Sequence, residues 1–392
     1  MSGRHDIDIR ALRGLDGLEA IASDWRTLAL GMTNARPWHF PEWHKAFASA
    51  LAPSSSEFLT LTGRNSGQLQ FIVPLITNSR RLNGRNARLI QIPYHPHAQF
   101  GDAVAIGKSV DSLTTLLTGL QSPVEDMPEF DILNLPMFLD DARIAQSLAH
   151  NVDPERITIE TLTHADFLNV PNYDTYLDGL SKNFRANLRK ARNKLMAAGT
   201  VEHVVARHAD SLRQAVDDFL QLEKSGWKGT KGTSTAISMD QSLVRFYHLL
   251  AEGFGTLGMC EVHQLRLNGQ TIASNFCLVS GETCHILKIA YDESRSAMAP
   301  GNMLLEHVLK GCSADGRVHT VHLMSDAGWH EDWKCSNQSV MRAEIMSESK
   351  VSKSIRRRRA FQQRMKPILA TGSRVKSTLK HILVPLHNFL HG

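Results

Sequence analysis

Residues 258–311 constrain the fold of this chain more than any other stretch, because they read as three strands followed by a helix. The dipeptide Asn268-Gly269 favours a two-residue hairpin turn, since both residues tolerate positive φ. Ser280-Gly281-Glu282 supplies a second turn. After the third strand, a polar loop leads from Arg295 to Pro300-Gly301-Asn302, which predicts the start of a helix. Free N–H groups and the positive end of the helix dipole meet at such a start, so we expect a site for an anion such as a pyrophosphate.

Length and composition predict a globular protein of two domains. The chain has 392 residues, of which 42% are hydrophobic and 21% charged, and this length exceeds that of one ordinary core. No apolar run approaches the ~20 residues of a membrane span. The N-terminus has no apolar segment of the kind that directs secretion. The five cysteines show no CxxC spacing, which favours reduced core thiols and a cytoplasmic protein.

The net charge of +5 comes from the C-terminal segment alone. Residues 351–392 contain ten Lys or Arg and no acid, which leaves 34 bases against 39 acids in residues 1–350. A mildly acidic body argues against nucleic-acid binding, so we expect no nucleic-acid partner. The segment itself carries Arg356 to Arg359, followed by leucines, isoleucines and further bases. Such a basic amphipathic segment suits an anionic membrane surface, and the alternative is a partly disordered, solvated extension.

The first half predicts helices followed by a strand meander. Apolar residues recur at three- and four-residue steps within residues 11–50, and strands are expected over residues 58–62, 68–77 and 87–92. The strand and turn rhythm of this meander resembles that of residues 263–279, which suggests two copies of one architecture. His39, His95 and His97 form a histidine-rich group, but no fourth ligand stands at a familiar spacing, and we expect no metal.

The second half opens with an amphipathic helix whose outer face is entirely basic. Ser181 is placed to begin this helix and Gly199 to end it. The basic face either is simply solvated or forms a positive rim that attracts the phosphates of a ligand, and Arg185 is our candidate for substrate binding. Further on, Trp227 and Lys228 stand in a Gly/Thr/Lys loop without the spacing of a Walker motif. Such a loop suits a mobile lid over a substrate.

The order of elements in the second half resembles the GNAT acyltransferase superfamily. More narrowly, the chain resembles the CelD-like acetyltransferase family, which is related to the Fem-type peptidyltransferases with two GNAT-like domains. The residues that carry this resemblance are FRANLRKARNKL, the Trp227-Lys228-Gly229 loop, GQTIASNFCLV, LKIAYDESRSAMAPGNMLLEHVL and the segment with Trp329, Trp333 and Lys334. In the first half, Trp25, Phe40-Pro41-Glu42-Trp43 and Val73-Pro74-Leu75 match the degenerate first domain of that family.

The resemblance implies an α+β fold of two tandem GNAT-like domains, each with a mixed, mostly antiparallel sheet flanked by helices. The domains would span residues 1–160, a degenerate copy, and residues 161–350, the acyltransferase copy. A basic helical tail, residues 351–392, would follow. The activity implied is N-acyl transfer, acetyl transfer in the first instance, from acyl-CoA to an amine. A small molecule, an amino sugar or an envelope or exopolysaccharide precursor is the expected acceptor.

The same resemblance assigns roles to the candidate site residues. The CoA pyrophosphate would lie at the helix start, with Arg295, Pro300, Gly301, Asn302 and Met303 as its binding residues. The superfamily pattern Q/R-x-x-G-x-G/A is not spelled out here, because Ser-Ala-Met-Ala-Pro-Gly follows Arg295. Trp329 joins Arg185, Trp227 and Lys228 as a candidate for substrate binding, in the region where many GNAT enzymes place a tyrosine that this chain lacks.

Acyl transfer from a thioester needs a base for the amine and an acid for the thiolate. Candidates are Lys288 and Asp292 at the end of the third meander strand, Glu223 before the loop, and His285. For Lys288 the alternative is an edge residue paired with Asp292 or Glu293. Two further functions stay open: an aminoacyl-tRNA-dependent peptidyltransferase of the Fem type, and a non-enzymatic scaffold or regulator that keeps only the GNAT-like shape.

Overall fold

The computed structural model describes residues 7–82, 84–107, 113, 126–148, 153–229 and 232–361. The strands are β1 Asp8–Arg13, β2 Phe58–Asn65, β3 Gln68–Leu82, β4 Arg85–Gln91, β5 Val104–Ala105, β6 Ile132–Leu139, β7 Ile157–Asn169, β8 Val201–Ala206, β9 Cys260–Leu267, β10 Gln270–Ser280, β11 Thr283–Tyr291, β12 Thr320–His322 and β13 Ser336–Met346. The helices are α1 Gly14–Glu19, α2 Ala22–Leu30, α3 Pro41–Ala50, α5 Arg143–Leu148, α6 Tyr173–Gly179, α7 Lys182–Ala198, α8 Ala209–Ser225, α9 Gln241–Thr256 and α10 Pro300–Asp315. Four 3₁₀ turns, η1 Pro37–His39, η2 Ile237–Met239, η3 Glu293–Met298 and η4 Gly328–Trp333, lie between them.

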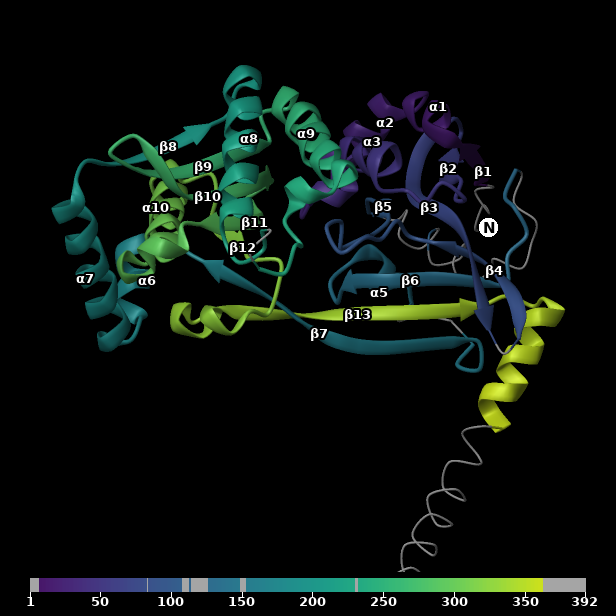
Figure 1. Ribbon diagram of the computed structural model, residues 1–392. Helices are drawn as coiled ribbons and strands as arrows, with labels where there is room; N and C mark the ends of the chain where they lie inside the picture. The colour runs from purple at the N-terminus through teal and green to yellow at the C-terminus, as the bar shows by residue number, and fades with distance from the viewer. Residues whose placement is uncertain are drawn as a thin grey trace, which may run out of the picture.

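All these strands belong to one sheet. Each end of the sheet consists of four consecutive antiparallel strands followed by one parallel neighbour. The order is β1-β2-β3-β4-β6-β13-β7-β12-β11-β10-β9-β8, with β5 added to β3 (Figure 1). Neighbours are antiparallel except at two places, β4 with β6 and β11 with β12, which stand at matching positions. The two halves of the chain therefore repeat one mixed, mostly antiparallel arrangement, and the predicted α+β architecture is confirmed.

The two halves exchange strands at the centre of the sheet. β13, from the end of the second half, lies between β6 and β7 and pairs with both over most of its length. β7 in turn pairs with β12 at Phe167 to Asn169. The boundary predicted at residues 160 and 161 falls within β7, so the sheet crosses from one half to the other without a break.

The halves also share a core. α3 packs against α9, where the Trp43 ring meets Phe246 at 5.8 Å and the Phe40 ring meets Phe254 at 6.1 Å, centroid to centroid. These aromatic side chains are fully or almost fully buried. On the opposite face of the second half, α7 and α10 cover the sheet through a separate apolar cluster that contains Leu188 and Leu305. Burial of large aromatic side chains on both sides of the junction holds the halves in one body.

In the second half, the predicted hairpin turn and the predicted starts of two helices are confirmed. Leu267 pairs with Gln270, so Asn268 and Gly269 form the two-residue turn, with φ of 52° and 78°. Ser181 accepts a hydrogen bond from the Phe184 N–H and begins α7. α10 begins at Pro300. Before α9, the Asp240 carboxylate accepts hydrogen bonds from the Ser242 and Leu243 N–H groups and caps the helix.

The described part of the C-terminal segment is helical over residues 350–361 and packs on the first half (Figure 1). Ile355 is fully buried, and the Ser352 hydroxyl donates to the Asp131 carbonyl. Residues 362–392 lie outside the described residues. In the part of the chain that the structure describes, no helix is both long and apolar enough to span a bilayer.

Candidate functional site

A cavity opens where the parallel strands β11 and β12 separate. The two strands pair only from Thr283 opposite Thr320 to His285 opposite His322. β12 ends there, whereas β11 continues to Tyr291. The gap between them holds a cavity of about 520 Å³, a volume typical of a small-molecule site. Its walls are Ile286 to Tyr291, Leu323 to Ser325, Ala299 to Asn302, Gln99, Lys228, Asn275, Ser296, Leu305, Ala327, Trp329 and His330.

The backbone along this gap is free to bind a ligand. Within the described part of the chain, β11 has no strand partner beyond His285 on the side of β12. Its register against β10 also slips at Leu287, since Phe276 faces Lys288 while Cys277 faces Ile286. A bulge of this kind redirects backbone groups and is common beside functional sites. Peptide N–H and C=O groups without a strand partner need another one, and an extended amide-containing ligand could supply it.

The N-terminus of α10 closes one end of the cavity. Ala299 has a left-handed backbone (φ 44°, ψ 54°) and places Pro300 at the first helical position. Met303 N–H donates to the Ala299 carbonyl, so the earlier N–H groups of Gly301 and Asn302 lie in the first turn, where helix N–H groups have no intrahelical acceptor. A Cβ atom on Gly301 would lie 3.5 Å from the Tyr291 ring. Two free donors, the helix dipole and a missing side chain suit an anionic group.

Two lysines line the end of the cavity that faces the first half. The Lys228 ammonium pairs with the Glu223 carboxylate at 2.9 Å, and the second oxygen of Glu223 accepts from the Ile237 N–H. Among the described residues, Lys288 has no hydrogen-bond or ion-pair partner. Burial, followed by the positive charge of Lys228, lowers the pKa of Lys288 to about 8, against a smaller upward effect of Glu223. A desolvated cation without a partner favours a negatively charged or strongly polar ligand beside it.

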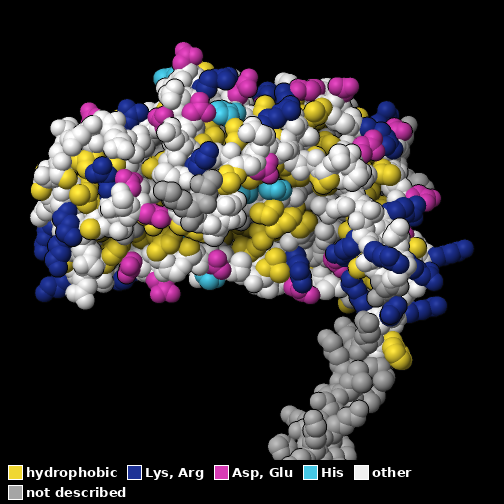
Figure 2. All heavy atoms as spheres, viewed as in Figure 1, with side chains coloured by type: hydrophobic (Ala, Val, Ile, Leu, Met, Phe, Trp, Pro, Cys, Tyr) yellow, Lys and Arg dark blue, Asp and Glu magenta, His cyan; other side chains and the backbone are white. Residues whose placement is uncertain are grey.

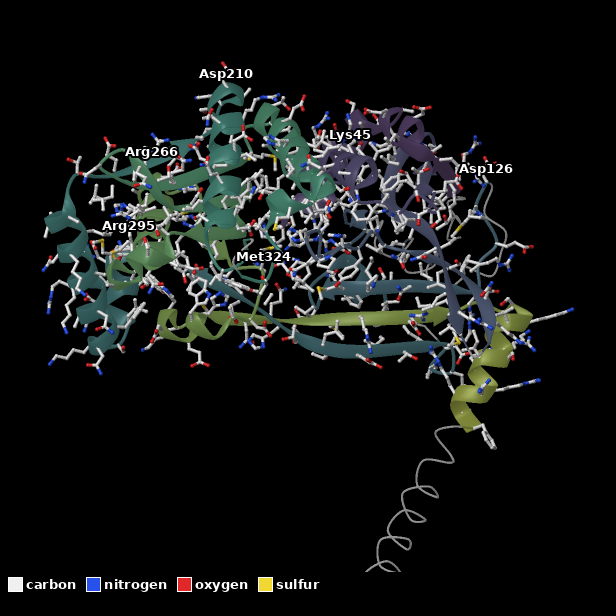
Figure 3. All side chains as sticks on the ribbon, viewed as in Figure 1. Lys45, Asp126, Asp210, Arg266, Arg295 and Met324 are labelled. Carbon is white, nitrogen blue, oxygen red and sulfur yellow. The ribbon has the colours of Figure 1, made fainter. Side chains whose placement is uncertain are left out.

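The first half contributes to this end of the cavity through the loop after β4. Gln99 lines the wall, and His97 Nδ1 lies 3.0 Å from the Tyr247 hydroxyl on α9. Burial lowers the pKa of His97 to about 3, helped by the charge of Lys288. The lysine end of the cavity therefore lies at the junction of the halves. Figure 3 shows Arg295 beside α10 on one side and Met324 nearer the junction.

A buried histidine lines the wall opposite β11. His330, in η4, is 2% exposed, and its Nδ1 lies 2.7 Å from Asp166 Oδ2 on β7. The two residues are 164 positions apart in the chain. No spacing pattern could have paired them. In the sequence, His330 stands beside Trp329 in the segment where the resemblance to GNAT enzymes expects a tyrosine, whereas nothing in the sequence singles out Asp166.

The structure brings together six of the predicted site residues. Those that line the cavity are Lys228, Lys288, Pro300, Gly301, Asn302 and Trp329. Of the four candidates for proton transfer, only Lys288 is among them. Asp292 is instead engaged by Arg295 at 2.9 Å, and Glu223 by Lys228. His285 is 1% exposed and packs against the Trp38 and His322 rings.

The other predicted binding residues lie outside the lining. Arg295 is held by Asp292, and Met303 is buried in the core beneath α10. Arg185 pairs with Asp178 at 3.0 Å. Trp227 is 55% exposed, and its backbone N–H donates to Glu293. Figure 2 shows the basic side chains of α7 at one end of the molecule and those of residues 350–361 at the other.

No group of three or more His, Cys, Asp or Glu side chains in the described ranges is arranged to hold a metal ion. His39 donates to Asp102 at 3.0 Å rather than joining His95 and His97. The His95 and His97 rings lie 5.7 Å apart, centroid to centroid, in the loop after β4.

Comparison with known proteins supports a GNAT-type fold. Residues 182–334, from the start of α7 to Lys334, match the family model described as "Acetyltransferase (GNAT) domain". No curated protein matches the sequence. Among solved structures, FemX superposes with a TM-score of 0.54 at 9% identity, covering 82% of this chain and 95% of FemX.

Two further solved structures overlap with most of the chain at lower scores. A C-terminal domain of a putative lysylphosphatidylglycerol synthetase from Agrobacterium fabrum has a TM-score of 0.49 and 8% identity, covering 86% of this chain and 95% of its own. A tandem GNAT protein from the clavulanic acid biosynthesis pathway has a TM-score of 0.45 and 13% identity, covering 88% and 100%. Residues 182–334 therefore match a model of a GNAT acetyltransferase domain, the fold is similar to that of FemX, and strands β11 and β12 lie within the matched residues.

Proposed function

We propose that this protein is an N-acyltransferase that moves an acyl group from an acyl-CoA to an amine. One observation carries the proposal: the parallel strands β11 and β12 separate at the N-terminus of α10, inside the region that matches the acetyltransferase model. The gap offers free backbone groups along its length and an anion-binding helix start at its end. A thioester with a pyrophosphate at one end and an amide-containing arm needs both features.

The residues present fit acyl-CoA as the donor. The first-turn N–H groups at Gly301 and Asn302 would hold the pyrophosphate, and the lack of a side chain at Gly301 would allow close approach. The backbone of β11 beyond His285 would hold the amide-containing arm. A backbone N–H beside the bulge at Leu287 would stabilise the negative charge that develops on the thioester oxygen during attack.

The acceptor would enter from the junction of the halves. Lys228, Lys288, Asn275 and Gln99 line that end, and polar groups of this kind suit a hydroxyl-rich or anionic amine. An amino sugar or an envelope or exopolysaccharide precursor fits this lining, as expected for a CelD-like acetyltransferase of polysaccharide biosynthesis acting in the cytoplasm. Peripheral contact with a membrane through residues 351–392 belongs to the same proposal.

The proposal is tested by thiol release. Purified protein is offered acetyl-, butyryl- and longer acyl-CoAs with a panel of amines, amino sugars included, and free CoA is measured with a thiol reagent. We expect release that depends on the amine, and an N-acylated product by mass spectrometry. An aminoacyl-tRNA donor is run in parallel, because the alternative Fem-type activity would use it. Transfer from aminoacyl-tRNA with no thiol release from any acyl-CoA would replace the proposal by that alternative.

A further inference from the structure

The buried pair of His330 and Asp166 forms a fixed part of the cavity wall. β7 supplies Asp166, the strand at the centre of the sheet that both halves share. The Asp166 backbone is tied on both sides to the chain that leaves β12, since its N–H donates to the Ser325 carbonyl at 3.0 Å and its carbonyl accepts from the Leu323 N–H at 2.8 Å. The carboxylate is therefore held against His330 by the same residues that shape the cavity.

The two ring nitrogens of His330 have different surroundings. Nδ1 lies 2.7 Å from Asp166 Oδ2, a distance that favours an N–H at Nδ1 and leaves a lone pair on Nε2. Nε2 has no hydrogen-bond partner among the described residues. Nδ1 of His285 and Nε2 of His322 are fully enclosed and lack a partner in the part of the chain that the structure describes, whereas Nε2 of His330 is not fully enclosed. Because His330 lines the cavity, Nε2 is the ring atom available to a ligand there.

The other charged groups near the pair are acidic or are histidines. His164 Nε2 lies 3.5 Å from Asp166 Oδ1. Asp326 bonds to the Thr163 hydroxyl, which lowers the pKa of that carboxyl with help from the charges of His164 and His330. Lys334, in the same turn, is directed away, since its ammonium donates to the Gly179 carbonyl at 2.7 Å. The partner of His330 Nδ1 is therefore a carboxylate, and the ammonium in the same turn points away from the ring.

We propose that His330 is the proton-transferring residue of the acyl transfer and that Asp166 is its positioning residue; this assignment rests on the proposed function. As the amine nitrogen forms its bond to the thioester carbon, Nε2 takes one proton from that nitrogen. As the bond from carbon to sulfur breaks, the imidazolium returns the proton to the sulfur. The products are the amide and free CoA thiol, and His330 ends neutral as it began. One imidazole acts first as base and then as acid, as in serine hydrolases.

His330 supplies the proton acceptor that the candidate residues on β11 and α8 do not supply. Glu223 and Asp292 are already engaged in ion pairs. Lys288 lies at the lysine end of the cavity and remains mostly protonated at neutral pH, given its pKa of about 8. A protonated lysine holds negative charge but cannot accept a proton.

The test compares His330→Gln, His330→Ala and Asp166→Asn with wild type, and uses His164→Gln as the control. His164 neighbours Asp166 but does not line the cavity. Three quantities are measured: kcat by thiol release, Kd for CoA by calorimetry, and the pH dependence of kcat. Loss of a general acid or base lowers rates by about 10²- to 10⁴-fold. We expect His330→Gln to lose at least ~100-fold in kcat with an unchanged Kd for CoA, and imidazole in the buffer to raise the rate of His330→Ala.

Asp166→Asn should lower kcat by at least ~10-fold and alter the pH profile, because the amide cannot stabilise the imidazolium. His164→Gln should keep wild-type kcat. Two results would overturn the assignment and leave the proposed function standing, provided that wild type is active. One is a kcat of His330→Gln within ~3-fold of wild type. The other is an unchanged pH profile of kcat without rescue by imidazole. Wild type that releases no thiol from any acyl-CoA with any amine would overturn both.

Discussion

The two halves of the sheet repeat the same parallel strand pair, but the space between the two strands beyond that pairing differs between the halves. β4 meets β6 over three residue pairs, from Leu89 opposite Ile132 to Gln91 opposite Asn134. β11 meets β12 over three residue pairs as well. In the second half the strands then separate around a cavity. In the first half the chain after β4 turns back and fills the corresponding space.

The filling in the first half is apolar and tight. Ile92, Ala98 and Phe100 are at most 2% exposed. The Gly101 N–H donates to the Met137 carbonyl of β6 at 3.2 Å, and a Cβ atom at Gly101 would lie only 2.0 Å from Ile92 Cγ2. At Ile92 and Gly101, a ligand between β4 and β6 would have to displace these packed side chains.

A carboxylate of the protein also occupies a helix start in the first half. Asp102 is 1% exposed and accepts hydrogen bonds from the Arg143 and Ile144 N–H groups at the start of α5, both at 2.9 Å. His39 donates to the same carboxylate. At α10, by contrast, no side chain among the residues that the structure describes caps the first turn. The start of α5 is therefore satisfied by a carboxylate of the protein, whereas the start of α10 is open to the ligand that we propose.

The largest expected effect is a loss of CoA affinity when a bulky side chain is placed at the start of α10. Gly301→Phe adds a ring where a Cβ already contacts Tyr291 at 3.5 Å, and the ring would occupy the approach to the helix N–H groups. We expect CoA affinity by calorimetry to fall at least ~100-fold, or about 3 kcal/mol, with the melting temperature within a few degrees of wild type. Gly311→Ala, on the same helix with open space around it, is the control and should bind CoA normally. Normal binding by Gly301→Phe would place the site elsewhere.

The same kind of change in the filled half should cost stability. Gly101→Ala forces its methyl group onto Ile92, and overpacking of this kind costs about 1–3 kcal/mol. Chemical denaturation should report that loss. CoA affinity of the folded variant should stay within about twofold of wild type, because the first half does not hold the pyrophosphate. A variant of unchanged stability would mean that the space beside Ile92 is not filled.

A smaller effect is expected from the unpaired lysine. Because the pKa of Lys288 falls to about 8 in the folded protein, the folded state binds this proton less tightly than the unfolded chain does. The stability cost is therefore fully present below pH 8 and is recovered as the pH rises toward 10.5. Lys288→Met should be more stable than wild type by about 1–3 kcal/mol at pH 7, with the difference shrinking by pH 10.

Denaturation at both pH values measures this difference. Lys45→Met is the control, because the Lys45 side chain on α3 is 43% exposed and pairs with Glu19 (Figure 3). It should show no comparable gain at pH 7. A destabilised Lys288→Met would indicate that the lysine has a partner in solution.

The smallest effect on the fold is expected at the C-terminus. A chain ending at Phe361 keeps the packed helix with Ile355 and Ser352 and removes the rest of the basic segment. It should retain its melting temperature and its activity on soluble acceptors, yet lose sedimentation with vesicles that contain anionic lipid. A chain ending at residue 350 is the contrasting variant and should lose stability. If the longer chain still binds the vesicles, the membrane proposal is wrong.

Local features of the sequence predicted the local geometry well. Asn268-Gly269, Ser181 and Pro300-Gly301 act through φ preferences and capping, which depend on neighbouring residues only. Because Pro300 follows β11 closely in the chain, the start of α10 could be expected to lie near the end of β11. β1 was missed because its few residues precede an apolar helical pattern that appeared to extend over it.

Features that depend on long-range pairing could not be predicted. Nothing local indicates that β13 lies between β6 and β7, since its neighbours come from strands far away in the chain. The contact between His330 and Asp166 follows from that arrangement. Likewise, Glu223 and Asp292 were reasonable bases by residue type, but their partners Lys228 and Arg295 became evident only in three dimensions.

A crystal structure of the protein with CoA is the most direct test of the central claim. The account predicts CoA between β11 and β12, with its pyrophosphate on the Gly301 and Asn302 N–H groups, its sulfur toward His330, and no ligand between β4 and β6. CoA bound in the first half, or on the basic face of α7 with the β11 and β12 gap closed, would contradict it.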